Sequence, residues 1–83
     1  MQITTTNIPT DVIAGFTKEG AKPLVFKYAG KKWVVEKVNL VYEKRTGDGK
    51  LIYFSVTSQN NYFKLAFETN NLRWRIEEIY SEG

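Results

Sequence analysis

The residues of this chain best suited to contact a ligand are aromatic and basic side chains interleaved along its second half. Aromatic rings stack on unpaired bases and Lys and Arg attract phosphates, so a sheet face that mixes them resembles surfaces that bind single-stranded nucleic acid. The sequence predicts one such outer face, formed by Tyr53, Tyr62, Lys64, Arg73, Arg75 and, at a hairpin tip, Lys44 and Arg45. In the alternative interpretation, the tyrosines are ordinary strand residues and the charges only solvate the sheet.

Catalytic chemistry is hard to assemble from the other side chains. The chain has no histidine and no cysteine, which removes the most common general base and the most common metal ligands. Ser55, Ser58 and Ser81 have no histidine to activate them. Adjacent Glu77 and Glu78 point to opposite faces of a regular strand. We therefore expect a protein that is not an enzyme, with no cofactor, no metal and no small-molecule substrate.

The positive charge is unevenly distributed. Residues 18–50 carry nine Lys or Arg and four acids, a balance of +5, whereas residues 51–83 carry three and four, a balance of −1. A mildly basic half is weak support for an anionic partner. The simpler explanation is that lysines solubilise the strands and protect the sheet edges from pairing.

Alternating apolar and polar residues from Pro23 to Tyr80 define the strands that position these side chains. Because a strand's side chains alternate between faces, each hairpin must have a register that keeps apolar residues on one face. Gln59-Asn60 and Asn70-Asn71 fit two-residue turns that satisfy this condition. The resulting pairs are Val56 with Phe63, Phe54 with Leu65, Ile52 with Phe67, Phe67 with Trp74, Leu65 with Ile76, Glu68 with Arg73, and Lys64 with Glu77.

Two more turns complete the predicted fold. Ala29-Gly30 sets Phe26 opposite Trp33, and a three-residue loop at Gly47-Asp48-Gly49 sets Tyr42 opposite Phe54. Both tryptophans, Trp33 and Trp74, then belong to the core. The apolar residues switch between odd-numbered and even-numbered positions along the chain, which a regular strand cannot place on one face. This switch predicts β-bulges at Glu36-Lys37 and near Glu77-Glu78. The prediction is all-β: a single small antiparallel meander of five to six strands, curled into a barrel or half-barrel.

The N-terminal part of the chain differs in composition. Residues 1–10 are polar and threonine-rich, and we expect a flexible tail ahead of a single β domain over residues 11–83. The tail does not resemble a signal peptide, and no stretch reaches the roughly 18 apolar residues of a membrane span, so we expect a cytoplasmic protein. Residues 11–17 fit a strand or a short helix capped by Thr10; the strand is favoured because Glu19-Gly20 resembles a hairpin turn.

Three segments form a recognisable order of motifs: PLVFKYAGKKWVV at 23–35, YFKL at 62–65 and LRWRIEEIY at 72–80. This order, over residues 11–80, resembles a family of small uncharacterised bacterial β-domains. Its members are similar to short proteins sometimes linked with lesion-bypass DNA polymerases. The resemblance implies work on nucleic acid and assigns no catalytic residues. The stretch after Tyr42 is shorter than the family pattern and lacks an expected tryptophan.

Two hypotheses of function follow from these observations. In the first, the chain is an accessory or protein-interaction domain that binds a protein partner or a second copy of itself. The binding surface would be the side of the sheet that carries Val25 and Val34, or an exposed edge strand. In the second, it binds single-stranded nucleic acid through the outer basic and aromatic face. The first is favoured, because many domains without catalytic chemistry bind proteins.

Overall fold

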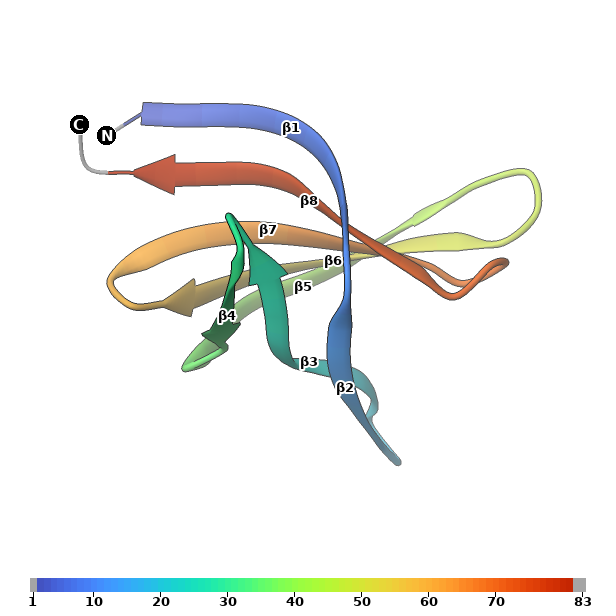
Figure 1. The fold of residues 1–83 in the computed structure, drawn as a ribbon. Helices are drawn as coiled ribbons and strands as arrows, with labels where there is room; N and C mark the ends of the chain where they lie inside the picture. The colour runs from blue at the N-terminus through green and yellow to red at the C-terminus, as the bar shows by residue number, and fades with distance from the viewer. Residues whose placement is uncertain (1, 82–83) are drawn as a thin grey trace.

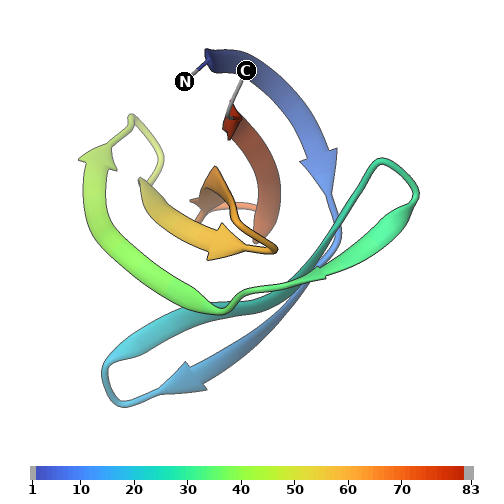
Figure 2. The same ribbon diagram turned by 90° about the vertical axis from the view of Figure 1, so that its left-hand side faces the viewer.

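The structure, a computed structural model, describes residues 2–81. Within this range the chain forms the strands β1 (Gln2–Thr10), β2 (Val12–Thr17), β3 (Gly20–Tyr28), β4 (Lys31–Val34), β5 (Lys37–Arg45), β6 (Lys50–Ser58), β7 (Asn61–Glu68) and β8 (Arg73–Ser81). They make a five-stranded sheet in the order β1-β8-β7-β6-β5 and a three-stranded sheet in the order β2-β3-β4. In Figures 1 and 2 the large sheet curls and the small sheet runs across one of its faces.

This architecture confirms the prediction of an all-β antiparallel fold and corrects its details. The predicted single meander of five to six strands is wrong, because the chain divides its strands between two sheets. Across the described residues 2–81 these sheets do not join into a closed barrel. Nor does any of these residues belong to a helix long and apolar enough to cross a bilayer.

The β6–β7 hairpin has the predicted register. Val56 lies opposite Phe63, and Phe54 lies opposite Leu65. The turn residues Gln59 and Asn60 have φ angles of 48° and 64°. These left-handed conformations are the ones that a type I′ turn requires, so the turn and the apolar pattern specify the same register.

The β7–β8 hairpin keeps its predicted register but has a different turn. Phe67 pairs with Trp74, as predicted, although the connection spans the four residues 69–72 instead of two. The Leu72 amide donates to the Glu68 carbonyl at 2.9 Å, and Leu72 takes a φ of 59°. The predicted bulge near Glu77 is confirmed by a register shift, so Lys64 pairs with Glu78 and not with Glu77.

The β5–β6 hairpin contradicts the predicted register. Tyr42 lies opposite Tyr53, not Phe54, because the turn contains four residues, Thr46 to Gly49, instead of three. This one-residue change moves Tyr42 to the outer face of the sheet. A register shift at Asn39 restores the inward direction of Val38. The predicted bulge at Glu36-Lys37 is instead a break between β4 and β5, where the chain passes from the small sheet to the large one.

The N-terminal segment contradicts the prediction of a flexible tail. Gln2–Thr10 forms β1, an edge strand that pairs along β8, and the Thr6 hydroxyl donates to the Ile76 carbonyl at 2.5 Å. The β-branched isoleucines and threonines of this segment favour an extended strand. Residues 12–17 form a strand, which confirms the favoured interpretation of that segment.

The core lies between the two sheets, and its centre is aromatic. Phe26 and Trp33 of the small sheet pack against Phe63 of the large sheet, with ring centroids 4.9 and 5.2 Å from that of Phe63. Trp33 is buried, and Trp74 is half-buried against the same core, in agreement with the prediction for both tryptophans. Phe26–Trp33 is also a cross-strand pair of β3 and β4, as predicted.

The core assignment predicts unequal effects of the same small substitution at two isoleucines. Ile76 is completely buried, whereas Ile13 is 59% exposed. We expect Ile76→Val to lower the free energy of unfolding by about 1 kcal/mol and Ile13→Val to change it by less than about 0.5 kcal/mol. Urea unfolding followed by tryptophan fluorescence measures both, and equal losses would contradict this core.

Candidate functional site

The outer face of the large sheet brings together part of the predicted binding surface. Tyr53 is buried and stacks on Tyr42, with ring centroids 4.8 Å apart. The Lys64 ammonium lies 5.0 Å from the Tyr53 ring centroid and 3.5 Å from a Glu78 carboxylate oxygen. Tyr80 donates a hydrogen bond to Glu78. These side chains therefore satisfy one another and present little free hydrogen-bonding capacity to a ligand.

Arg75 is similarly engaged. Its guanidinium lies 2.5 Å from a Glu68 carboxylate oxygen and 3.4 Å from one of Glu77. With Lys64 and its partner Glu78 included, this part of the face holds two cations against three carboxylates. Because this part of the face carries more negative than positive groups, its net charge does not attract phosphates.

The remaining predicted residues lie around these ion pairs, with Tyr62 opposite Tyr80 and Arg73 opposite Glu68 in the β7–β8 ladder. Tyr62 is 45% exposed on β7. Lys44 and Arg45 lie at the end of β5, beside the four-residue turn, and Arg73 is the first residue of β8. The structure therefore does not gather the predicted residues into one continuous basic surface. The missed feature is the set of carboxylates around Arg75, because a cross-strand register alone does not fix which acid a long side chain reaches.

The paired groups of the outer face have shifted proton affinities. The hydrogen bond to Glu78 raises the pKa of the Tyr80 hydroxyl. Burial raises the pKa of Tyr53. A side-chain hydrogen bond with Tyr42, helped by the charge of Glu78, raises the pKa of the Lys64 ammonium against an opposing effect of burial. Each raised pKa favours the protonated form of its group in the folded protein.

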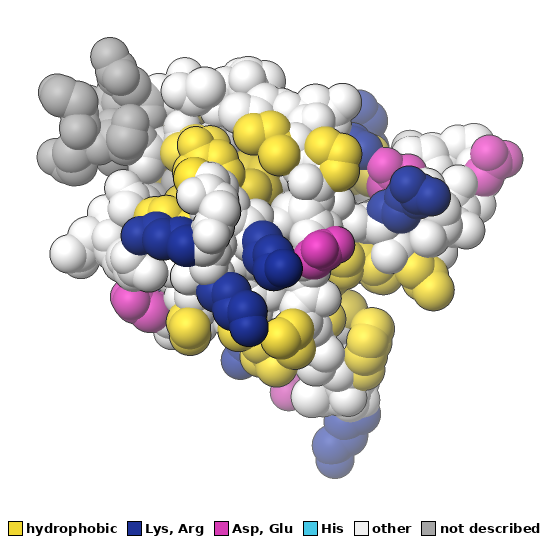
Figure 3. All heavy atoms as spheres, in the orientation of Figure 1, with side chains coloured by type: hydrophobic (Ala, Val, Ile, Leu, Met, Phe, Trp, Pro, Cys, Tyr) yellow, Lys and Arg dark blue, Asp and Glu magenta, His cyan; other side chains and the backbone are white. Residues whose placement is uncertain are grey.

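A groove of about 940 Å³ lies between β2 of the small sheet and the β7–β8 turn of the large sheet, and Glu68, Arg73 and Arg75 contribute to its lining. Strand β1 pairs with β8 as far as Thr10 and Trp74, and the chain then turns away to become β2. The two sheets diverge from this point. Hydrophobic atoms gather between β2 and the β7–β8 turn in Figure 3. The apolar residues that line the groove are Pro9, Val12, Ala14, Phe16, Phe67, Leu72 and Trp74.

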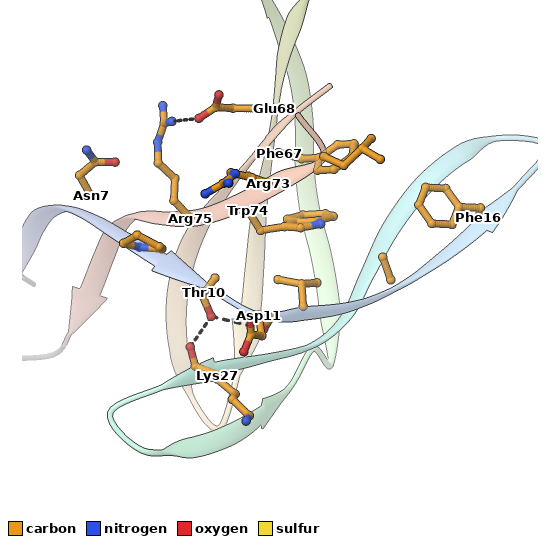
Figure 4. Close-up of a pocket in the computed structure, with 14 residues that line it drawn as sticks. Asn7, Thr10, Asp11, Phe16, Lys27, Phe67, Glu68, Arg73, Trp74 and Arg75 are labelled. Carbon is orange, nitrogen blue, oxygen red and sulfur yellow. Dashed lines mark hydrogen bonds and ion pairs between the residues drawn. The ribbon is translucent and has the colours of Figure 1, made fainter. Parts of the chain in front are cut away.

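Two of the groove residues are unusual for a small domain. Phe16 is 73% exposed and Leu72 is 72% exposed, from opposite sides of the groove. Figure 4 shows Phe16 on the β2 side and Phe67 and Trp74 on the other. Leu72 also has its φ of 59°, a conformation that is strained for a bulky residue. Strained backbone conformations cluster at functional sites, and here the strain keeps an apolar side chain exposed to solvent.

Strand β2 also presents free backbone groups to this region, because it is an edge of the small sheet. The Lys27 amide donates to the Asp11 carbonyl at 3.1 Å, so Asp11 belongs to a hydrogen-bonded pair of the ladder. Bonded and non-bonded pairs alternate in an antiparallel ladder. The ladder shifts register between Ile13 and Ala14, but the extra residue, Leu24, lies on β3, so β2 keeps its alternation. The amides and carbonyls of Val12, Ala14 and Phe16 therefore face the open edge. These are also the β2 residues whose side chains line the groove.

The proline at position 23 supports the assignment of bonded and non-bonded pairs in the β2–β3 ladder. Pro23 lies opposite Ala14 on β3, and proline has no amide hydrogen to donate. A proline fits here only if Ala14 and Pro23 form a non-bonded pair, as the alternation requires. None of these groove features was predicted from the sequence. The available signal was the spacing of Val12, Ala14 and Phe16 on one face of a strand.

One polar group of the groove stabilises the fold. The Thr10 hydroxyl donates to the Lys27 carbonyl at 2.5 Å, which holds the corner between β1 and β2. Among the residues that the structure describes, no group of three or more acidic, histidine or cysteine side chains could hold a metal ion.

Comparison of the chain with protein-family models, with curated proteins and with solved structures found no match. The resemblance to bacterial β-domains therefore stays a prediction.

The raised pKa values predict how stability depends on pH. A group with a raised pKa in the folded state contributes its full stability below its unfolded pKa and loses it as the pH rises through the folded pKa. We therefore expect the free energy of unfolding to fall above about pH 10, where free Tyr and Lys begin to titrate. Urea unfolding at several pH values should show a smaller fall for Tyr80→Phe, which has no proton to lose there.

The exposed Tyr62 provides the control for this measurement. Tyr62→Phe removes a hydroxyl on the same strand as Lys64 but outside the described ion pairs. This variant should lose stability with pH as the parent does. An identical fall in the parent and in Tyr80→Phe would show that the bond between Tyr80 and Glu78 does not stabilise the folded state.

Proposed function

We propose that this chain is a non-enzymatic protein-interaction module that binds an extended segment of a partner protein by strand addition to β2. One observation carries the proposal: Val12, Ala14 and Phe16 combine open backbone groups with side chains that line an apolar groove. Strand addition uses both features, since backbone hydrogen bonds provide affinity and alternate side chains enter pockets.

The composition of the groove supports an apolar segment as the ligand. A bound strand on the open edge of β2 would place every second side chain toward Phe67, Leu72 and Trp74. The exposed Phe16 and Leu72 would lose contact with water, and burial of such side chains gives about 1.5–3 kcal/mol each when complete. The same burial would explain why the fold keeps two apolar side chains more than 70% exposed.

Charge favours this proposal over nucleic-acid binding at the outer face. Lys64 and Arg75, the central cations of that face, are each paired with carboxylates. A nucleic acid would have to displace those carboxylates before its phosphates could be neutralised. Of the other predicted residues, Tyr62 lies at the start of β7, whereas Lys44, Arg45 and Arg73 lie toward the opposite end of the sheet, so such a ligand would find separated contacts.

The proposal predicts that binding depends on Phe16, whose side chain lines the groove, and not on Ile13, whose side chain lies on the other face of β2. The probe is a capped peptide of about six residues, the usual length of a strand, with valine alternating with threonine. We expect Phe16→Ser to weaken its binding at least about tenfold, because the buried area of one aromatic side chain is lost. Titration of the isotope-labelled protein, followed by NMR, measures the affinity.

Ile13 offers a matched control, since it is 59% exposed on the same strand but does not line the groove. Ile13→Ser should bind the peptide as the parent does. Equal losses in both variants would contradict the groove as the binding site. Binding of a single-stranded oligonucleotide that weakens by orders of magnitude between about 50 and 200 mM salt, with no peptide binding, would favour the outer face instead.

A second candidate function is self-association through β5, an open edge of the large sheet with apolar side chains. Leu40, Val41 and Tyr42 are 56%, 51% and 38% exposed. The Thr46 amide donates to the Gly49 carbonyl, so the alternation of the ladder turns the backbone groups of Val41 toward the open edge. A two-fold axis at Val41 would set Leu40 opposite Tyr42 of the second copy, so that the apolar residues pair with one another.

Self-association predicts a specific effect of a charge on this edge. In Val41→Lys the introduced ammonium groups of two copies would lie opposite each other, and such like charges oppose pairing. Sedimentation velocity should show that the variant is monomeric at concentrations where the parent forms dimers. Val34→Lys, at a 59% exposed position of the other sheet, should leave the dimer intact. A monomeric parent at every accessible concentration would contradict this candidate.

A further inference from the structure

We infer that the extended segment carries an acidic residue, which pairs with Arg73 at the β7–β8 end of the groove. This inference rests on the proposed function and adds the chemical class of the ligand. Its basis is the arrangement of charges along the groove, which is complementary to a carboxylate at one end only.

The carboxylate nearest to Arg73 in the ladder is already occupied. Glu68 lies directly opposite Arg73. One of its carboxylate oxygens accepts from the Arg75 guanidinium at 2.5 Å, and the other accepts from the Asn71 side-chain amide at 3.0 Å. Within residues 2–81, no ion pair is formed by Arg73. A groove-lining guanidinium is therefore available to a ligand.

The turn holds Arg73 in position. The backbone amide of Arg73 donates to the side-chain oxygen of Asn71 at 3.0 Å, and the other end of the same amide group donates to Glu68. This pair of bonds ties the first residue of β8 to the last residue of β7. The exposed side chain of Leu72 lies immediately before Arg73. An acidic residue of the ligand would therefore neighbour the apolar residue that covers Leu72.

The other charged groups of the groove do not offer a second site for a carboxylate. Asp11 and Lys27 lie on the far side of Trp74 from Arg73 in Figure 4, and the Lys27 side chain points away from Trp74. Asp11 and Lys27 carry opposite charges, so that end is neutral overall. Arg75 is paired with Glu68 and Glu77. The free positive charge is thus concentrated at the β7–β8 end.

Three capped peptides that differ at one position test this inference. Each alternates valine with threonine over about six residues, and one threonine near the end is kept or replaced by aspartate or by lysine. For the parent protein we expect the aspartate peptide to bind about two- to fivefold more tightly than the threonine peptide, the usual range of an exposed ion pair. The lysine peptide should bind more weakly than both.

Charge reversal at Arg73 should invert this order. Arg73→Glu should prefer the lysine peptide, and Lys27→Glu, which changes the net charge equally, should keep the order of the parent. An effect of Lys27→Glu equal to that of Arg73→Glu would overturn the assignment to Arg73. If the three peptides bind equally and Phe16→Ser weakens all of them, the inference fails and the proposed function stands. If no peptide binds the folded parent, the proposed function fails, and the inference fails with it.

Discussion

The structure depends on the packing of Phe26 and Trp33 on Phe63, which joins the small sheet to the large sheet. Their ring centroids lie 4.9 and 5.2 Å from that of Phe63, and all three side chains are buried. An aromatic contact of this kind contributes about 0.5–1.5 kcal/mol beyond the area it buries. Because this contact lies at the β3–β4 side of the small sheet, the β2 side is free to diverge from the large sheet, and the groove is the result.

Polar bonds at the two corners fix the angle between the sheets. At one corner the Thr10 hydroxyl donates to the Lys27 carbonyl, next to the bond from the Lys27 amide to Asp11. At the other, the buried Ser58 hydroxyl donates to the Val34 carbonyl at 2.7 Å. An unpaired buried hydroxyl would destabilise the fold, so the orientation of the chain at this corner is specified. The groove is thus held by the same bonds that stabilise the domain.

The sequence predicted contacts that depend on side-chain alternation and missed those that depend on the geometry of turns and corners. Phe67–Trp74 was predictable because an apolar face allows one register, even though the turn has four residues. Tyr42 was misplaced because the β5–β6 turn is one residue longer than its glycines suggested. The groove could not be predicted, because it arises where β1 leaves β8 at Thr10, and no local pattern marks that point.

Amide hydrogen exchange tests strand addition to β2 most directly. In the free protein, the amides of Val12, Ala14 and Phe16 face the open edge, whereas those of Ile13 and Gly15 face β3. On addition of a saturating extended peptide, exchange should slow at the first three amides and stay nearly unchanged at the other two. Uniform slowing along β2, or slowing confined to the large sheet, would contradict the account.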